Sequence, residues 1–134
     1  IQRDLRDVVY SNVIMRRKRG VSWASVMPRE IDEIINLDEL DQVCRQIFYV
    51  DKNLRDDLEL FPDSAVYHVE YENLCGAPKI EMENILKFAA DNNIQLQAHA
   101  TEIPQDFALS KPKTEGWIDE KEIIRIDSIL ESLR

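Results

Sequence analysis

A long amphipathic pattern between residues 38 and 60 constrains this chain more than any other feature. Apolar side chains recur there at spacings of three and four, as one stripe of a helix requires. The stripe consists of Leu40, Val43, Ile47, Val50 and Leu54. Because Phe61-Pro62-Asp63 breaks the pattern, we predict a long helix that ends at about residue 60.

A shorter helix is predicted near the start of the chain. Apolar residues recur at helical spacing from Asp7 to about Arg17. Asp7 is a favourable N-cap, and Gly20 follows the last turn as a stop signal. The mixed segment 21–36 predicts a loop with a short helical piece.

Two further helices are predicted in the second half. Pro78 is well placed in the first turn of one of them, which presents Met82, Ile85, Leu86 and Ala89 on one face. The last begins with a capping-box-like pair, Asp119 and Glu122, and carries the stripe Ile123, Ile126, Leu130 and Leu133. Residues 104–118 between them predict a loop.

The stretch AVYHVEYENL, residues 65–74, predicts one strand over about residues 65–71. It is rich in β-branched and aromatic side chains and lacks glycine and proline. A single strand cannot satisfy its own backbone groups, so we expect it to pair with strands from elsewhere. The pattern therefore predicts a mostly helical chain with one strand.

Length and charge restrict the function classes. The chain has 134 residues, which is one domain or part of one. Its formal net charge of -9 argues against non-specific nucleic-acid binding, which needs a basic face. No run approaches about 20 apolar residues, so we expect no membrane segment.

The cysteines suggest neither a metal site nor a redox motif. Cys44 and Cys75 are far apart and lack the spacing of a zinc knuckle or a CxxC pair. We expect two buried, idle thiols, with a disulfide as the alternative.

The segment RDLRDVVYS, residues 3–11, has the composition of an anion site. The free amides and positive end of a helix N-terminus favour negative charge. Arg3 can offer a bidentate guanidinium to a phosphate, and Ser11 can add a hydroxyl. The alternative is an ordinary turn in which Arg3 pairs with Asp4 or Asp7.

This segment resembles the 3′-phosphate-binding segment of sulfotransferases that use 3′-phosphoadenosine 5′-phosphosulfate (PAPS). The pattern in that family is Arg-Asp-Pro-Arg-Asp-Val, with a serine eight residues after the first arginine. Arg3 and Ser11 have this spacing, and Leu5 replaces the proline.

Three further blocks follow in the order of the family and extend the resemblance over nearly the whole chain. WASVMP and the long helix after it resemble a tryptophan-bearing loop and its helix. Tyr71-Glu72-Asn73-Leu74, with Pro78 and Phe88 behind it, resembles a Tyr-Glu-Asp-Leu-like motif. SKPKTEGW resembles a Ser-Lys block near the C-terminus of carbohydrate-type members.

The resemblance implies a role for five residues. Arg3 and Ser11 would bind the 3′-phosphate of PAPS, and Tyr71 would lie near the adenine. Ser110 and Lys111 would belong to a basic loop that closes over the nucleotide. Lys113 would join them, with solvated loop lysines as the alternative reading.

The fold class that the resemblance implies is α/β, that of a P-loop nucleotide kinase, with a parallel sheet covered by helices. Its glycine-containing phosphosulfate loop is not found here, because Gly20, Gly76 and Gly116 stand alone. We therefore expect residues 1–134 to be the C-terminal portion of one sulfotransferase domain. We also expect this portion by itself not to transfer sulfate.

The predicted function is transfer of a sulfuryl group from PAPS to a hydroxyl or amine of a small molecule or glycan, without a metal. PAP, 3′-phosphoadenosine 5′-phosphate, would be the product. The alternatives are a non-catalytic helical interaction module and another P-loop-type phosphotransferase. We expect a bacterial cytoplasmic enzyme, with the Golgi lumen as the alternative location.

Other candidate residues have simpler explanations. His68 and His99 do not match the catalytic base of the family, and we expect His68 to pack beside the sheet. The cluster Arg16–Arg19 is predicted to be a solvated helix end, with a contact for an acidic acceptor as the alternative. Trp23 is either a stacking surface for a sugar or a core residue.

Overall fold

The computed structural model describes residues 1–96 and 104–134, which divide into two compact units. We call the first the helical core unit; it comprises Asp4–Leu58 and Lys111–Arg134. We call the second the α4–α5 unit; it comprises Ile1–Arg3 and Glu59–Ser110.

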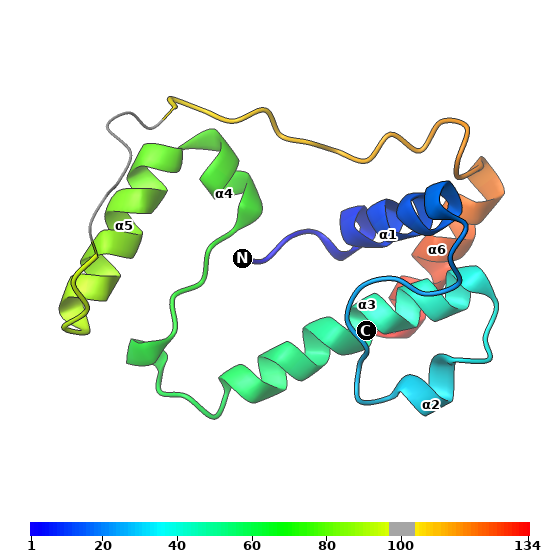
Figure 1. The fold of residues 1–134 in the computed structure, drawn as a ribbon, viewed down its shortest axis with the longest axis horizontal. Coiled ribbons are helices and arrows are strands. Elements are labelled where there is room, and N and C mark those ends of the chain that lie inside the picture. Colours follow the sequence, from blue (N-terminus) through cyan, green and yellow to red (C-terminus); the bar gives the residue numbers. More distant parts are fainter. Residues whose placement is uncertain (97–103) are drawn as a thin grey trace. The chain divides into compact units, whose positions relative to one another are not determined.

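Three helices of the helical core unit pack around one apolar core (Figure 1). They are α1 (Leu5–Arg19), α3 (Glu39–Leu58) and α6 (Glu120–Ser132), and the short α2 (Ile31–Ile34) lies between α1 and α3 in the sequence. The predicted apolar stripes supply much of the core, which consists of Val9, Tyr10, Val13, Ile14, Leu40, Val43, Cys44, Ile47, Ile118, Ile126, Ile129 and Leu130. These helices and the loop between α1 and α3 confirm the sequence predictions for this unit.

The ends of α1 and α6 show how local residues set the helix boundaries. α1 begins earlier than predicted, because the carboxylate of Asp4 rather than Asp7 accepts the amides of residues 6 and 7. Gly20 ends α1 in the left-handed conformation with φ 62°, as a C-cap glycine does. The predicted capping box of Asp119 and Glu122 is present at the start of α6.

The predicted strand at about residues 65–71 is wrong, and so is the α/β fold class. Helix makes up 59% of the described residues, and no strand or sheet forms among them. A 3₁₀ turn, η1 (Asp63–Ala65), precedes the segment, and α4 (Tyr71–Gly76) follows it. The extended segment between them makes one isolated parallel bridge, Gln2 with Glu70, and a ladder needs more partners than that.

Helix α5 (Pro78–Asp91) confirms the prediction that Pro78 opens a helix. It packs against the segment before α4 through two contacts of Tyr67. The Tyr67 hydroxyl donates to Glu81 at 2.8 Å, and its ring centroid lies 5.4 Å from that of Phe88. The apolar and aromatic character of residues 65–70 therefore serves helix packing.

Arg16 of α1 is buried and binds neutral partners. Its side chain is only 1% exposed, and its guanidinium donates to the side-chain oxygens of Gln42 and Gln46 at 2.5 Å and to the carbonyl of Ser22 at 2.9 Å. Burial lowers the pKa of this guanidinium, although an arginine stays protonated in a protein. The amide of Gln46 in turn donates to the carbonyls of residues 24 and 26, so the loop after α1 is tied to α3.

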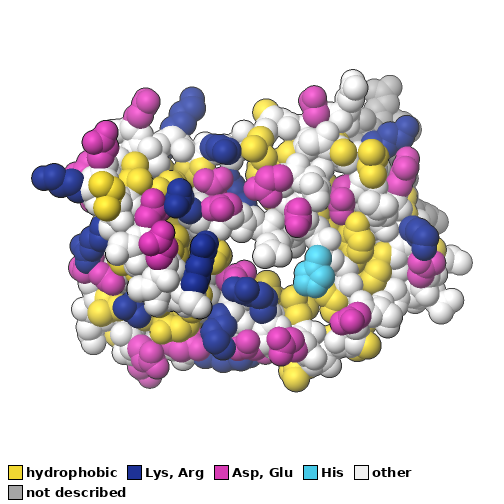
Figure 2. All heavy atoms as spheres, turned by 180° about the vertical axis from the view of Figure 1, so that it is seen from behind, with side chains coloured by type: hydrophobic (Ala, Val, Ile, Leu, Met, Phe, Trp, Pro, Cys, Tyr) yellow, Lys and Arg dark blue, Asp and Glu magenta, His cyan; other side chains and the backbone are white. Residues whose placement is uncertain are grey.

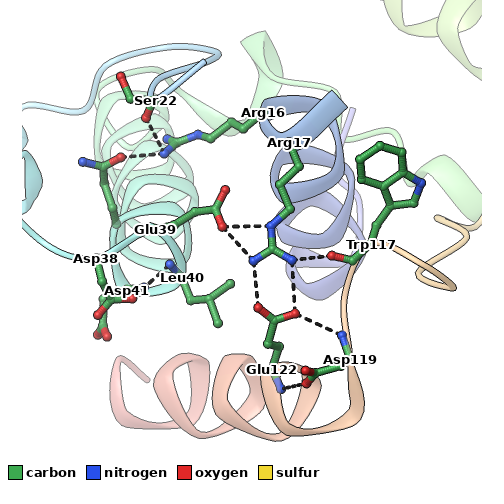
Figure 3. Close-up of polar contacts among 11 residues, drawn as sticks. Arg16, Arg17, Ser22, Asp38, Glu39, Leu40, Asp41, Trp117, Asp119 and Glu122 are labelled. Carbon is green, nitrogen blue, oxygen red and sulfur yellow. Dashed lines mark hydrogen bonds and ion pairs between the residues drawn. The ribbon is translucent and has the colours of Figure 1, made fainter. Parts of the chain in front are cut away.

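Arg17 joins all three helices of the core (Figure 3). Its guanidinium bonds to Glu39 on α3 at 2.7 Å and to Glu122 on α6 at 2.8 Å, and it also donates to the carbonyl of Trp117. Arg17 thus pairs with two carboxylates, one from each of the neighbouring helices. The expected solvated cluster at residues 16–19 is therefore wrong for its first two members.

Replacing Arg16 tests the buried network. Arg16→Met should lower the free energy of unfolding by roughly 2–4 kcal/mol, because both glutamine oxygens lose their charged donor while they remain buried. Urea unfolding followed by tryptophan fluorescence measures this, since Trp23 and Trp117 both lie in the helical core unit. The control is Arg19→Met, which alters an exposed arginine on the same helix and should change stability by less than about 0.5 kcal/mol. Equal effects of the two variants would contradict the role of Arg16.

The Arg17–Glu122 pair predicts a loss of stability in acid. The hydrogen bond from Arg17 lowers the pKa of Glu122 below its ordinary value of 4.5. The unfolded chain then takes up a proton at a higher pH than the folded chain, so stability is lost as the pH falls through the folded pKa. Glu122→Gln keeps both capping-box hydrogen bonds but carries no proton-binding carboxylate. Urea midpoints from about pH 5 to about pH 3 should fall less steeply for Glu122→Gln than for the unaltered chain; parallel curves would exclude a contribution from this carboxylate.

Candidate functional site

The α4–α5 unit brings together three of the five residues predicted to bind a nucleotide. Main-chain bonds position the start of the chain: the Gln2 amide donates to the Val69 carbonyl at 2.7 Å, and the Tyr71 amide donates to the Gln2 carbonyl at 2.8 Å. Arg3 follows directly, with its Cζ 4.6 Å from the centroid of the Tyr71 ring. Its Nη2 donates to the carbonyl of Ser110 at 2.5 Å.

This Arg3–Tyr71–Ser110 cluster fixes an arginine between segments that are distant in the sequence. Arg3 and Tyr71 are half-buried, while Ser110 is exposed. A guanidinium against an aromatic face gains a cation–π interaction, and the carbonyl sets its rotation about that face. The arrangement holds a planar cation next to an aromatic ring, which are the two group types that a purine nucleotide phosphate contacts.

The other two predicted residues, Ser11 and Lys111, belong to the helical core unit. Ser11 is exposed on α1, nearly two turns beyond the start of the helix at Leu5. Lys111 and Lys113 are exposed in the segment that leads to α6. Their predicted nucleotide contacts remain predictions.

The amides at the start of α1 are not open to an anion, contrary to the sequence expectation. One oxygen of the Asp4 carboxylate accepts from the Arg6 amide at 2.8 Å and from the Asp7 amide at 3.2 Å. A helix N-terminus that holds its own carboxylate already has the negative group that its dipole favours. Asp4 was missed, although an acidic residue three positions before Asp7 is a typical capping signal. Any phosphate contact must therefore depend on side chains.

The remaining predicted candidates lie in different surroundings. His68 is exposed rather than packed beside a sheet, and His99 falls outside the described residues. The Trp23 ring lies 5.1 Å from the Arg16 guanidinium carbon, so it packs on the buried network. Lys18 lies 5.3 Å from the centroid of the Trp117 ring, while Arg19 is exposed.

The charge around the candidate site is mixed. Glu70 and Glu72 flank Tyr71 in the sequence, and both are exposed. Acidic and basic side chains are also interspersed over the face drawn in Figure 2. Because the chain carries a formal net charge of -9, an anion would have to be held by individual positioned groups.

Within residues 1–96 and 104–134, no three His, Cys, Asp or Glu side chains are grouped so that they could hold a metal ion. Over the same ranges, no helix combines the length and apolar character needed to cross a bilayer.

In comparisons with known proteins, no family model, curated protein or solved structure matches this chain.

The two thiols are free, and their burial predicts that they are unreactive. Cys44 is fully buried, and desolvation raises its pKa to about 12; Cys75 is 5% exposed. A native chain at about pH 8 should therefore react with an aromatic disulfide reagent only slowly, because the reactive thiolate of Cys44 is scarce and access to both sulfurs is restricted. The same assay in denaturant should release two equivalents per chain. Rapid release of either equivalent from folded protein would contradict the packing described.

Proposed function

We propose that this chain contributes the 3′-phosphate-binding residues of a PAPS-dependent sulfotransferase. One observation carries the proposal: Arg3, Tyr71 and Ser110, which come from three separate motif blocks, meet in one unit. Arg3 and Ser110 are 107 positions apart, so their contact is a property of the folded chain rather than of local sequence.

Each member of the cluster has a distinct part in nucleotide binding. The Arg3 guanidinium supplies charge-assisted hydrogen bonds to the 3′-phosphate. The Tyr71 ring keeps the guanidinium in place and offers an aromatic edge to the purine. The carbonyl of Ser110 accepts a hydrogen bond from Arg3 and so fixes the orientation of the guanidinium.

The reaction proposed is sulfuryl transfer to a hydroxyl or amine, with a carbohydrate as the expected acceptor. The acceptor oxygen or nitrogen attacks sulfur, and the bond from sulfur to the 5′-phosphate oxygen breaks. The acceptor proton passes to a base, and PAP leaves. Arg3 and its neighbours bind the part of PAPS that does not react, and this positions the sulfuryl group for in-line attack.

Calorimetric titration of the 134-residue chain with PAP tests the proposal. PAP should bind, and Arg3→Ala should weaken binding by about 2 kcal/mol or more, which is about thirtyfold. Arg3→Lys should recover only part of the loss, because an ammonium cannot make the bidentate contact.

The matched control is Arg55→Ala on α3, where an exposed arginine pairs with Asp51. It removes the same charge and should leave PAP binding unchanged. Circular dichroism of each variant separates lost binding from lost structure. A folded chain that does not bind PAP would refute the proposal and favour the helical interaction module.

A further inference from the structure

We draw no further inference here: the strongest candidate, the C-terminal half of the apolar stripe of α3, which is exposed at Leu54, carries none because nothing in the described part of the structure shows what covers it.

Discussion

The helical core unit depends on one arginine that reaches three helices. Arg17 lies on α1 and bonds to Glu39 of α3, to Glu122 of α6 and to the Trp117 carbonyl just before α6. An arginine suits this position because its planar guanidinium carries donors on two edges, so each carboxylate can take its own edge. Apolar burial between the helices is non-directional, whereas this junction specifies which helix ends meet.

Arg16 and Arg17 have different roles, although they are neighbours on one helix: Arg16 binds neutral groups, and Arg17 pairs with carboxylates. Consecutive side chains point about 100° apart, so one guanidinium enters the interior while the other meets the carboxylates at its edge. Arg16 has neutral partners and is nearly inaccessible to water, a costly arrangement that the negative charge of nearby Glu39 partly offsets. Through Gln46 its network also holds the main chain of the following loop, so the conformation of residues 22–26 depends on buried polar groups.

Helices could be predicted from this sequence because their signals are local. The stripe of α3, the Gly20 stop, Pro78 and the capping box of α6 all act within a few residues. The strand prediction failed because β-branched and aromatic residues between 65 and 70 indicate burial without saying against what. Tyr67 contacts Glu81 and Phe88 of helix α5. Whether a segment packs on a helix or pairs with a strand depends on distant residues, which its own sequence does not show.

The same distinction applies to the candidate site. The resemblance predicted Arg3, Tyr71 and Ser110, but only the folded chain shows that they meet. The capping role of Asp4 could be predicted from its spacing to Asp7, but the positive charges of Arg3 and Arg6 are equally typical of an anion site. The burial of Arg16 and the ion pairs of Arg17 had no sequence signal, because four consecutive basic residues look the same whether or not groups from other helices approach them.

The first turn of α4 places a contact with a cation next to a negative charge. Tyr71 packs against the Arg3 guanidinium, whereas the next residue, Glu72, is exposed. The turn of about 100° between consecutive helical side chains directs the carboxylate away from the guanidinium. One short helix can therefore hold an arginine against an aromatic ring and, at the next position, an exposed carboxylate.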